Sequence, residues 1–287
     1  MSREPTPEEA VRIAAADSAL EEDPDDVARL VAAARVREDI WRYAEAVSLY
    51  GRAMARAPER YDLPLARGHR LIRLRSLDEA MTELDRALVL DPTGFNTAYL
   101  RGLTLYLQGR FREAARVYRE CLALAGFSIV GTPEGDPRQC AHLGTDPASR
   151  VAMTAWAVRA HRRAGEEGAA RDLLEALPAE VDTDALDGPF PEYEESPIVP
   201  GDNSHYWALL RYFRGGLPVD SLMNRERWGG QWPTVAYGVA AWWLADGEEE
   251  KARVLLEEIV DDPNWARLGH VAAEADLVRL LGEDPSS

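Results

Sequence analysis

Small residues and large apolar residues return along the first part of the chain at a fixed interval of 34 positions. The matched pairs are Gly68 and Gly102, Leu71 and Leu105, Ala80 and Ala114, and Leu84 and Tyr118. The same step leads back to Ala34, Ala46 and Tyr50. A fixed period of this length is typical of stacked helical hairpins. Small residues let the two helices of a hairpin approach closely, and the large residue one turn later fills the groove between neighbouring units.

The N-terminal pattern predicts three helices in succession. Thr6 is a suitable cap, with Pro7 at the first helical position and Glu9 three residues after the cap, so a helix is predicted from there to about Leu20. Asp25 or Asp26 would cap a second helix over 27–39. A third is predicted over 43–57 and is ended by Pro58.

The second half repeats this spacing with interruptions. Helices are predicted over 147–164, 167–177, 203–214 and 219–225, and Trp228–Pro233 is interpreted as a turn that leads into a sixth pair. Trp228 and Trp232 flank that turn, so we expect them to face solvent. A last helix is predicted from Pro263 to about Leu281. Its solvent-exposed face would be formed by Glu274, Asp276 and Arg279, as the terminal repeat of a stack requires.

From Val27 to about Gly126 the sequence resembles the tetratricopeptide repeat family, with its Gly/Ala, Ala, aromatic, Ala, Pro signature. The resemblance implies an all-α, right-handed α-solenoid of about six helical hairpins with a C-terminal capping helix. The predicted organisation is an N-terminal helix plus three regular units over 1–126, an irregular loop over 127–146, a fourth hairpin over 147–178, an acidic Pro-rich loop over 179–202, two hairpins over 203–262, and a capping helix and tail over 263–287.

Composition narrows the classes of partner. The formal net charge of −17 argues against nucleic acid and anionic membrane surfaces as partners, because both require a basic face. No apolar run is long enough to span a bilayer, and the N-terminus lacks the features of a secretory signal, so a cytoplasmic protein is expected. Lys251 is the only lysine, which is typical of a GC-rich bacterial genome.

The family resemblance places a defined set of side chains on the concave face of the stack. Carried over residue by residue, the groove positions are Arg35, His69, Arg73, Asn96, Tyr99, Tyr106, Arg159, Arg162, His205, Tyr212 and Tyr237. Arginine presents a planar fork to carboxylates, and tyrosine offers rigid apolar area with a polar tip. The expected function is therefore a non-enzymatic scaffold that binds a protein or peptide, including acidic or carboxylate-bearing segments.

Three alternatives stay open at this point. The arginines can instead pair with the abundant Asp and Glu of neighbouring helices. The chain can be a small-molecule receptor or an enzyme, with the two long loops as lids and with His69, His205 and His270 brought together. It can also self-associate through an exposed end of the stack, so the oligomeric state is open.

Signals for metal or catalytic chemistry are weak. His270 and Glu274 are four apart on a predicted helix, and Cys140 and His142 lie in the first irregular loop, but neither pair has further ligands at metal-site spacing. No nucleophile elbow, phosphate-binding loop or dinucleotide fingerprint occurs. We therefore predict no cofactor, no metal and no catalytic residue. Two cysteines do not form a disulfide framework, and Cys121 is expected to be a buried free thiol.

Overall fold

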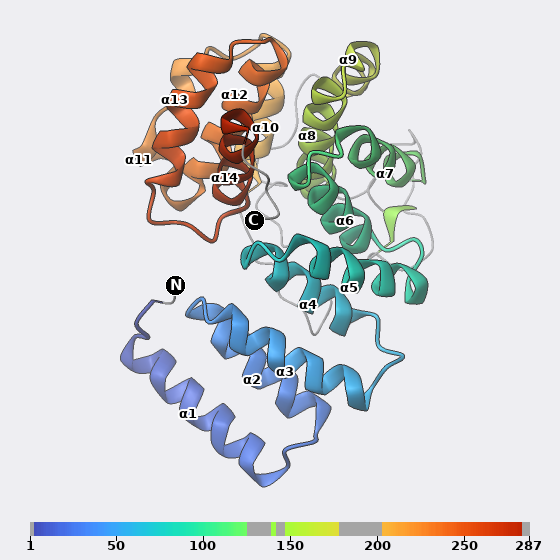
Figure 1. The fold of residues 1–287 in the computed structure, drawn as a ribbon, viewed down its shortest axis with the longest axis vertical. Helices are drawn as coiled ribbons and strands as arrows, with labels where there is room; N and C mark the ends of the chain where they lie inside the picture. Colours follow the sequence, from blue (N-terminus) through green and yellow to red (C-terminus); the bar gives the residue numbers. More distant parts are fainter. Residues whose placement is uncertain (1–2, 125–138, 142–146, 178–202, 283–287) are drawn as a thin grey trace. The chain divides into compact units, whose positions relative to one another are not determined.

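The predicted all-α solenoid fold is confirmed in a computed structural model, which describes residues 3–124, 139–141, 147–177 and 203–282. Figure 1 shows successive helices running back and forth as hairpins. Apart from helices, the described residues form only one isolated antiparallel bridge, between Gly94 and Gln139. The chain divides into two compact units, residues 1–92 and 93–287, which are described separately below.

Unit 1 contains five helices, each packed on the next. They are α1 (Pro7–Glu22), α2 (Val27–Asp39), α3 (Tyr43–Arg56), α4 (Asp62–Arg73) and α5 (Leu77–Leu90). Thr6 and Glu9 form the predicted capping box at the start of α1, and Asp26 caps α2 through the amide of Arg29. Leu30, Leu49 and Leu63, from α2, α3 and α4, belong to one buried apolar cluster.

Unit 2 contains the remaining helices. They are α6 (Phe95–Leu107), α7 (Phe111–Leu124), α8 (Pro147–Arg163), α9 (Glu167–Glu175), α10 (Ser204–Phe213), α11 (Arg225–Trp228), α12 (Trp232–Ala245), α13 (Glu249–Val260) and α14 (Leu268–Leu281). Helix α8 packs against α6, α7, α9, α10 and α12, and α14 packs against α12, α13 and α6. The interior of this unit is therefore built around α8.

The 34-residue repeat has a direct packing cause. A Cβ at Gly102 would lie 2.5 Å from Cε1 of Tyr118, and a Cβ at Gly68 would lie 2.9 Å from Cγ of Leu84. Ala80 and Ala114 are fully buried at the partner positions. Each hairpin thus closes on a small residue of its first helix, as the sequence pattern predicts, because the large residue of the second helix occupies that space.

A second periodic feature is the turn between the two helices of a hairpin. Trp41, Arg75 and Gly109 follow one another at 34-residue intervals, and all three have left-handed backbone, with φ of 61°, 65° and 76°. Gly165 and Gly247 occupy the corresponding turns of later hairpins, with φ of 74° and 78°. The turn conformation is therefore conserved along the chain even where the residue is not glycine.

The elements predicted after residue 200 require correction. The helix expected over 219–225 is instead a 3-10 turn over Val219–Ser221 and a separate one-turn helix, α11. Asn224 caps α11 by accepting from the amide of Arg227, which ends any continuous helix there. The last helix begins at Leu268 rather than at Pro263.

Three exposure predictions in the same region were wrong. Trp228 and Trp232 are buried, with exposed fractions of 8% and 2%. Helix α12 begins at Trp232, whose indole ring is part of the buried core. Asp276 does not contribute to a wet face on the last helix, since it is fully buried among arginine and tyrosine side chains. Glu274 and Arg279 remain partly exposed.

The predicted domain boundaries stay a prediction, although the third regular hairpin, α6–α7, groups with unit 2 rather than with unit 1. Most of the loop over 127–146 and all of the loop over 179–202 lie outside the described residues. None of the described helices combines the length and the apolar character that a bilayer crossing requires.

Candidate functional site

The predicted groove residues are divided between the two units. Arg35, His69 and Arg73 belong to unit 1, and the rest belong to unit 2. Most of the set is buried, and the ones that keep partial exposure are Arg35, Arg73, Arg162 and Tyr212. Their role in binding stays a prediction, and their surroundings differ from one group of side chains to the next.

In unit 1, His69 lies between two arginines of its own helix. Its Nδ1 is 2.6 Å from Nη1 of Arg70, and its Nε2 is 3.1 Å from Nη2 of Arg73. Burial, followed by the positive charges of Arg70 and Arg73, holds the pKa of His69 well below its usual value. The imidazole is therefore neutral at pH 7. It can accept a hydrogen bond at only one of its nitrogens.

Arg35 occupies the position equivalent to His69 one repeat earlier, on α2. Arg70 is paired with Glu38, also on α2. For Arg35, in contrast, the described residues offer no acceptor to the buried Nε and Nη2 atoms. The first helices of two consecutive hairpins thus carry a basic row, with Arg35 on one helix and Arg73 on the next.

In unit 2, several predicted groove residues meet in an aromatic interior. The ring of Trp156 (α8) is 5.4 Å from that of Tyr106 (α6) and 6.0 Å from that of Tyr237 (α12). All three side chains are fully buried. The hydroxyl of Tyr206 (α10) lies 3.1 Å from that of Tyr99 and 3.3 Å from Nε1 of Trp156. The groove positions Tyr99, Tyr106 and Tyr237 therefore belong to an enclosed core.

One carboxylate, Asp276 on α14, organises the polar part of this interior. Arg163 binds both of its oxygens, at 2.9 and 3.0 Å, and Arg279 donates to Oδ1 at 2.7 and 3.0 Å. The hydroxyl of Tyr237 donates to Oδ2 at 2.8 Å and lies 3.0 Å from the hydroxyl of Tyr106. Burial alone would raise the pKa of Asp276, but the charges and hydrogen bonds of Arg163 and Arg279 hold it below its usual value.

Arg159 lies on α8 one turn from Trp156 and is 1% exposed. Its guanidinium carbon is 3.7 Å from the centroid of the Trp156 ring and 5.9 Å from that of Tyr237. Nε donates to the carbonyl of Ala155 at 2.9 Å. The guanidinium thus lies over the face of an indole within the aromatic interior.

The remaining predicted residues have separate surroundings. Arg162 pairs with Asp246 and Glu167 and stacks on Trp242, which is the ion-pair alternative that the sequence left open. Tyr212 packs at the same Trp242 ring. His205 is buried against Tyr206, and Asn96 is buried at the start of α6.

The histidines do not form a metal centre within the part of the chain that the structure describes, where no group of three or more His, Cys, Asp or Glu side chains could hold an ion. His270 contacts Glu274 at 3.1 Å, and His161 contacts Glu166 at 2.7 Å. His142, which could have joined Cys140 in a metal site, lies outside the described residues.

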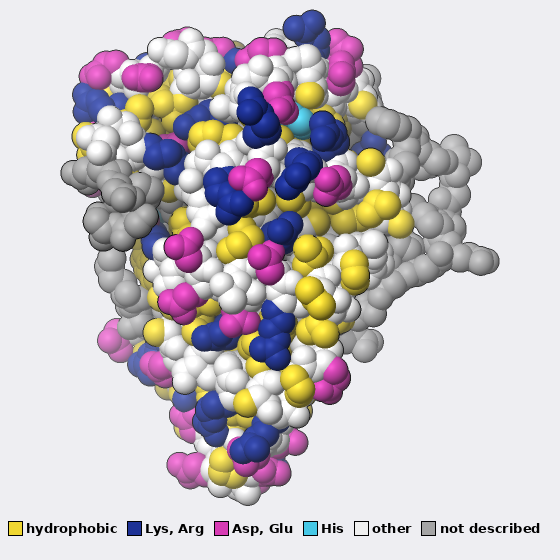
Figure 2. Space-filling model, turned by 45° about the vertical axis from the view of Figure 1, so that its right-hand side comes forward, with side chains coloured by type: hydrophobic (Ala, Val, Ile, Leu, Met, Phe, Trp, Pro, Cys, Tyr) yellow, Lys and Arg dark blue, Asp and Glu magenta, His cyan; other side chains and the backbone are white. Residues whose placement is uncertain are grey.

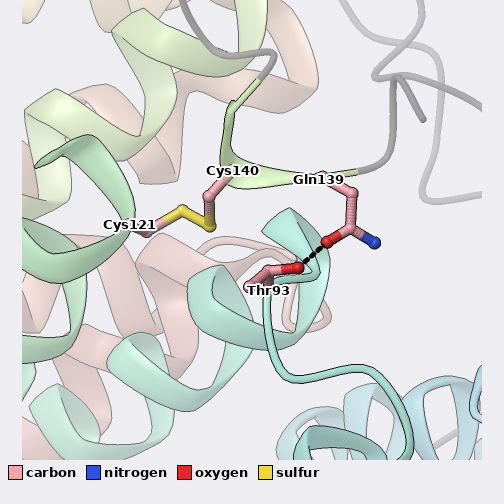
Figure 3. The surroundings of a disulfide bond; sticks show 4 residues. All are labelled: Thr93, Cys121, Gln139 and Cys140. Carbon is pink, nitrogen blue, oxygen red and sulfur yellow. Dashed lines mark hydrogen bonds between the residues drawn. A yellow bond between two sulfur atoms is a disulfide. The ribbon is translucent and has the colours of Figure 1, made fainter. Parts of the chain in front are cut away.

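The prediction that Cys121 is a free thiol was wrong, because Cys121 forms a disulfide with Cys140. Figure 3 shows Cys121 at the end of α7 joined to a short segment that also lies beside Thr93. The amide of Cys140 donates to the carbonyl of Thr93 at 2.8 Å, and Thr93 also bonds Gln139. Disulfides are rare in cytosolic proteins, and the predicted compartment stays a prediction.

On the described part of the face drawn in Figure 2, acidic and basic side chains are interspersed rather than gathered into a broad patch of either sign. Exposed ion pairs also occur along the described chain. Arg225, for example, pairs with Glu258 and Asp262, and Arg110 pairs with Glu113.

Sequence reasoning did not bring Trp156, Arg163, Tyr206 and Asp276 together in one interior. A signal existed for the first two, since Trp156, Arg159 and Arg163 follow at intervals of three and four residues and so share one face of a helix. No comparable signal linked Asp276 to them, because it lies more than a hundred positions away in the sequence.

No protein-family model matches the chain, and no curated protein matches it. Among solved structures, one entitled "Crystal structure of MamA" is 16% identical, covering 57% of this chain and 83% of that one, with a TM-score of 0.46. A second MamA structure covers 59% and 80%, at a TM-score of 0.47. The MSR-1 C2 form covers 58% and 88%, at 0.43. We therefore argue function from the chain's own residues.

Proposed function

We propose that the chain is a non-enzymatic protein-interaction scaffold of the tetratricopeptide repeat type. In this proposal, the first helices of unit 1 bind peptide segments that carry acidic side chains or a free carboxylate. The resemblance in the sequence supports the type of scaffold. The observation that carries the choice of ligand is the basic row on α2 and α4, where Arg35 and Arg73 are partly exposed.

The electrostatics of that row favour an anionic ligand. His69 is neutral and adds no charge, and Glu38 is already engaged by Arg70. Two nitrogens of Arg35 have no acceptor among the described side chains and carbonyls. A carboxylate placed there would gain charge-assisted hydrogen bonds that the folded chain itself does not provide.

The test is an array of acidic peptides synthesised with either free or amidated C-termini. We expect the double variant Arg35→Ala/Arg73→Ala to bind roughly tenfold more weakly or worse than the wild type, since a hydrogen bond to a charged group contributes about 1.5 kcal/mol or more. Arg86→Ala is the matched control, because Arg86 is an exposed arginine on α5, the second helix of its hairpin.

Two results would contradict the proposal. One is equal binding by the wild type and the double variant, provided that circular dichroism shows both to be folded. The other is an equal loss of binding in Arg86→Ala, which would indicate that net charge alone is being measured. A difference between free and amidated peptides would further assign the contact to the C-terminal carboxylate.

A further inference from the structure

The buried guanidinium of Arg159 has hydrogen-bonding capacity that the folded chain leaves unused. Arginine carries five N–H donors, and one of them, on Nε, is satisfied by the carbonyl of Ala155 at 2.9 Å. Among the described residues, no group accepts from Nη1 or Nη2, although both atoms are buried. A buried cation without an anionic partner is strongly unfavourable, so a negatively charged hydrogen-bond acceptor is expected beside Nη1 and Nη2.

The buried carboxylate of unit 2 that is described above already has its own partners. Asp276 accepts from Arg163, Arg279 and Tyr237, which together occupy both of its oxygens. The tyrosines that interact electrostatically with Arg159 are Tyr99, Tyr106 and Tyr118, and burial raises the pKa of each hydroxyl. These hydroxyls are therefore neutral at pH 7 and supply no negative charge.

We propose that Arg159 is the anchoring residue of an internal binding site in unit 2 for a small monocarboxylate. The free edge of the guanidinium, formed by Nη1 and Nη2, matches the two oxygens of a carboxylate in a bidentate arrangement. One uncompensated positive charge matches one negative charge, whereas a dianion would leave an excess negative charge in a buried setting.

The surroundings of Arg159 also indicate the rest of the ligand. Trp156, Tyr106 and Tyr237 are aromatic and fully buried, so an apolar or aromatic body attached to the carboxylate would be favoured over a charged one. Trp156 holds the guanidinium plane and Ala155 fixes Nε, so the binding edge is held in one orientation. This site lies in unit 2 and is independent of the peptide-binding face proposed for unit 1.

The experiment measures thermal unfolding of the full chain in sodium benzoate, acetate, phosphate or chloride at matched ionic strength. We expect the wild-type midpoint to rise with the logarithm of the benzoate concentration once that concentration exceeds Kd, and to do so with acetate at higher concentrations, while phosphate gives no rise beyond that in chloride. In Arg159→Met the benzoate response is lost. The midpoint of this variant in chloride equals or exceeds that of the wild type, since an unpaired buried charge has been removed.

Two further variants complete the design. Arg162→Met, which removes a paired arginine from the same helix, keeps the benzoate response. Arg159→Lys keeps the charge but loses the fork, so about tenfold more benzoate, or more, is needed to raise its midpoint by the same amount as in the wild type. The proposal is overturned if benzoate raises the wild-type midpoint no more than chloride does, or if Arg159→Met responds to benzoate as the wild type does. Should Arg159→Met fail to fold, an undiminished benzoate response in Arg159→Lys overturns it equally.

Discussion

At the scale of single residues, the glycines in left-handed turns allow the energetic cost of the backbone conformation to be measured apart from side-chain packing. A residue with a Cβ pays about 1–2 kcal/mol for this conformation, whereas glycine does not. Gly165 has φ of 74°, and a Cβ placed there would meet nothing within 4 Å. We therefore expect Gly165→Ala to lower the free energy of unfolding by about 1 kcal/mol, measured by chemical denaturation.

Gly168 provides the matched control for that substitution. It lies three residues further on, within α9, and a Cβ there would also meet nothing within 4 Å. Because its backbone is helical, Gly168→Ala should stabilise the protein by up to about 1 kcal/mol. The two glycine-to-alanine substitutions are therefore expected to change the free energy of unfolding in opposite directions. Equal changes would refute the explanation from backbone conformation.

Asp276 is the fully buried carboxylate that holds two arginines in the interior of unit 2. Asp276→Asn would leave Arg163 and Arg279 without their carboxylate, and removing one partner of a buried pair costs about 3–5 kcal/mol. Both arginines are partly exposed, so we expect the lower end of that range, from denaturation at pH 7. Glu113→Gln, which breaks an exposed pair with Arg110, should cost no more than about 1 kcal/mol.

The contribution of Asp276 also has a defined pH dependence. Its pKa is lower in the folded state than the ordinary value of 3.8, so the ionised form is favoured by folding. The stabilisation is fully present above about pH 4 and is lost as pH falls through the lowered folded pKa. The difference in unfolding free energy between wild type and Asp276→Asn should therefore narrow below pH 4, and a constant difference would contradict this origin.

At the scale of elements, most of the helices were predictable from the sequence, whereas the contacts that join the later helices were not. Gly68 and Leu84, or Gly102 and Tyr118, are local partners within one repeat, so a period in the sequence reports their contact directly. The interior of unit 2 depends instead on helices far apart in the chain. Arg163 meets Asp276 across 113 positions, and no periodic pattern encodes such a pairing.

The disulfide joins α7 to the short segment that contains Cys140 and should stabilise unit 2 measurably. Cys121 and Cys140 are 19 positions apart, and closing a loop of about this size is expected to contribute roughly 3 kcal/mol. Reduction should therefore lower the free energy of unfolding by about 2–4 kcal/mol. The double variant Cys121→Ser/Cys140→Ser should be insensitive to reductant. Thiol titration of the unfolded, unreduced protein should find no free thiol, and two titratable thiols would refute the disulfide.

At the scale of the whole molecule, the chain contains two compact units with separate interiors. Unit 1 has its own apolar cluster, formed by side chains of α2, α3 and α4, such as Leu30, Tyr50 and Leu63. In repeat proteins, stability is approximately the sum of the repeats and of the interfaces between neighbours. A cut that falls between units should therefore remove fewer stabilising contacts than a cut within one.

This leads to a prediction about fragments. Residues 1–92 expressed alone should fold, with a helical circular dichroism spectrum and a cooperative unfolding transition. A fragment that ends at Pro58 should not, because it lacks α4 and with it Leu63 and Ala66, which complete the apolar cluster against α2 and α3. If both fragments are unfolded, unit 1 depends on the rest of the chain for its stability. If both fold equally well, a single hairpin with α1 suffices, and the cluster around Leu63 contributes little to the stability of unit 1.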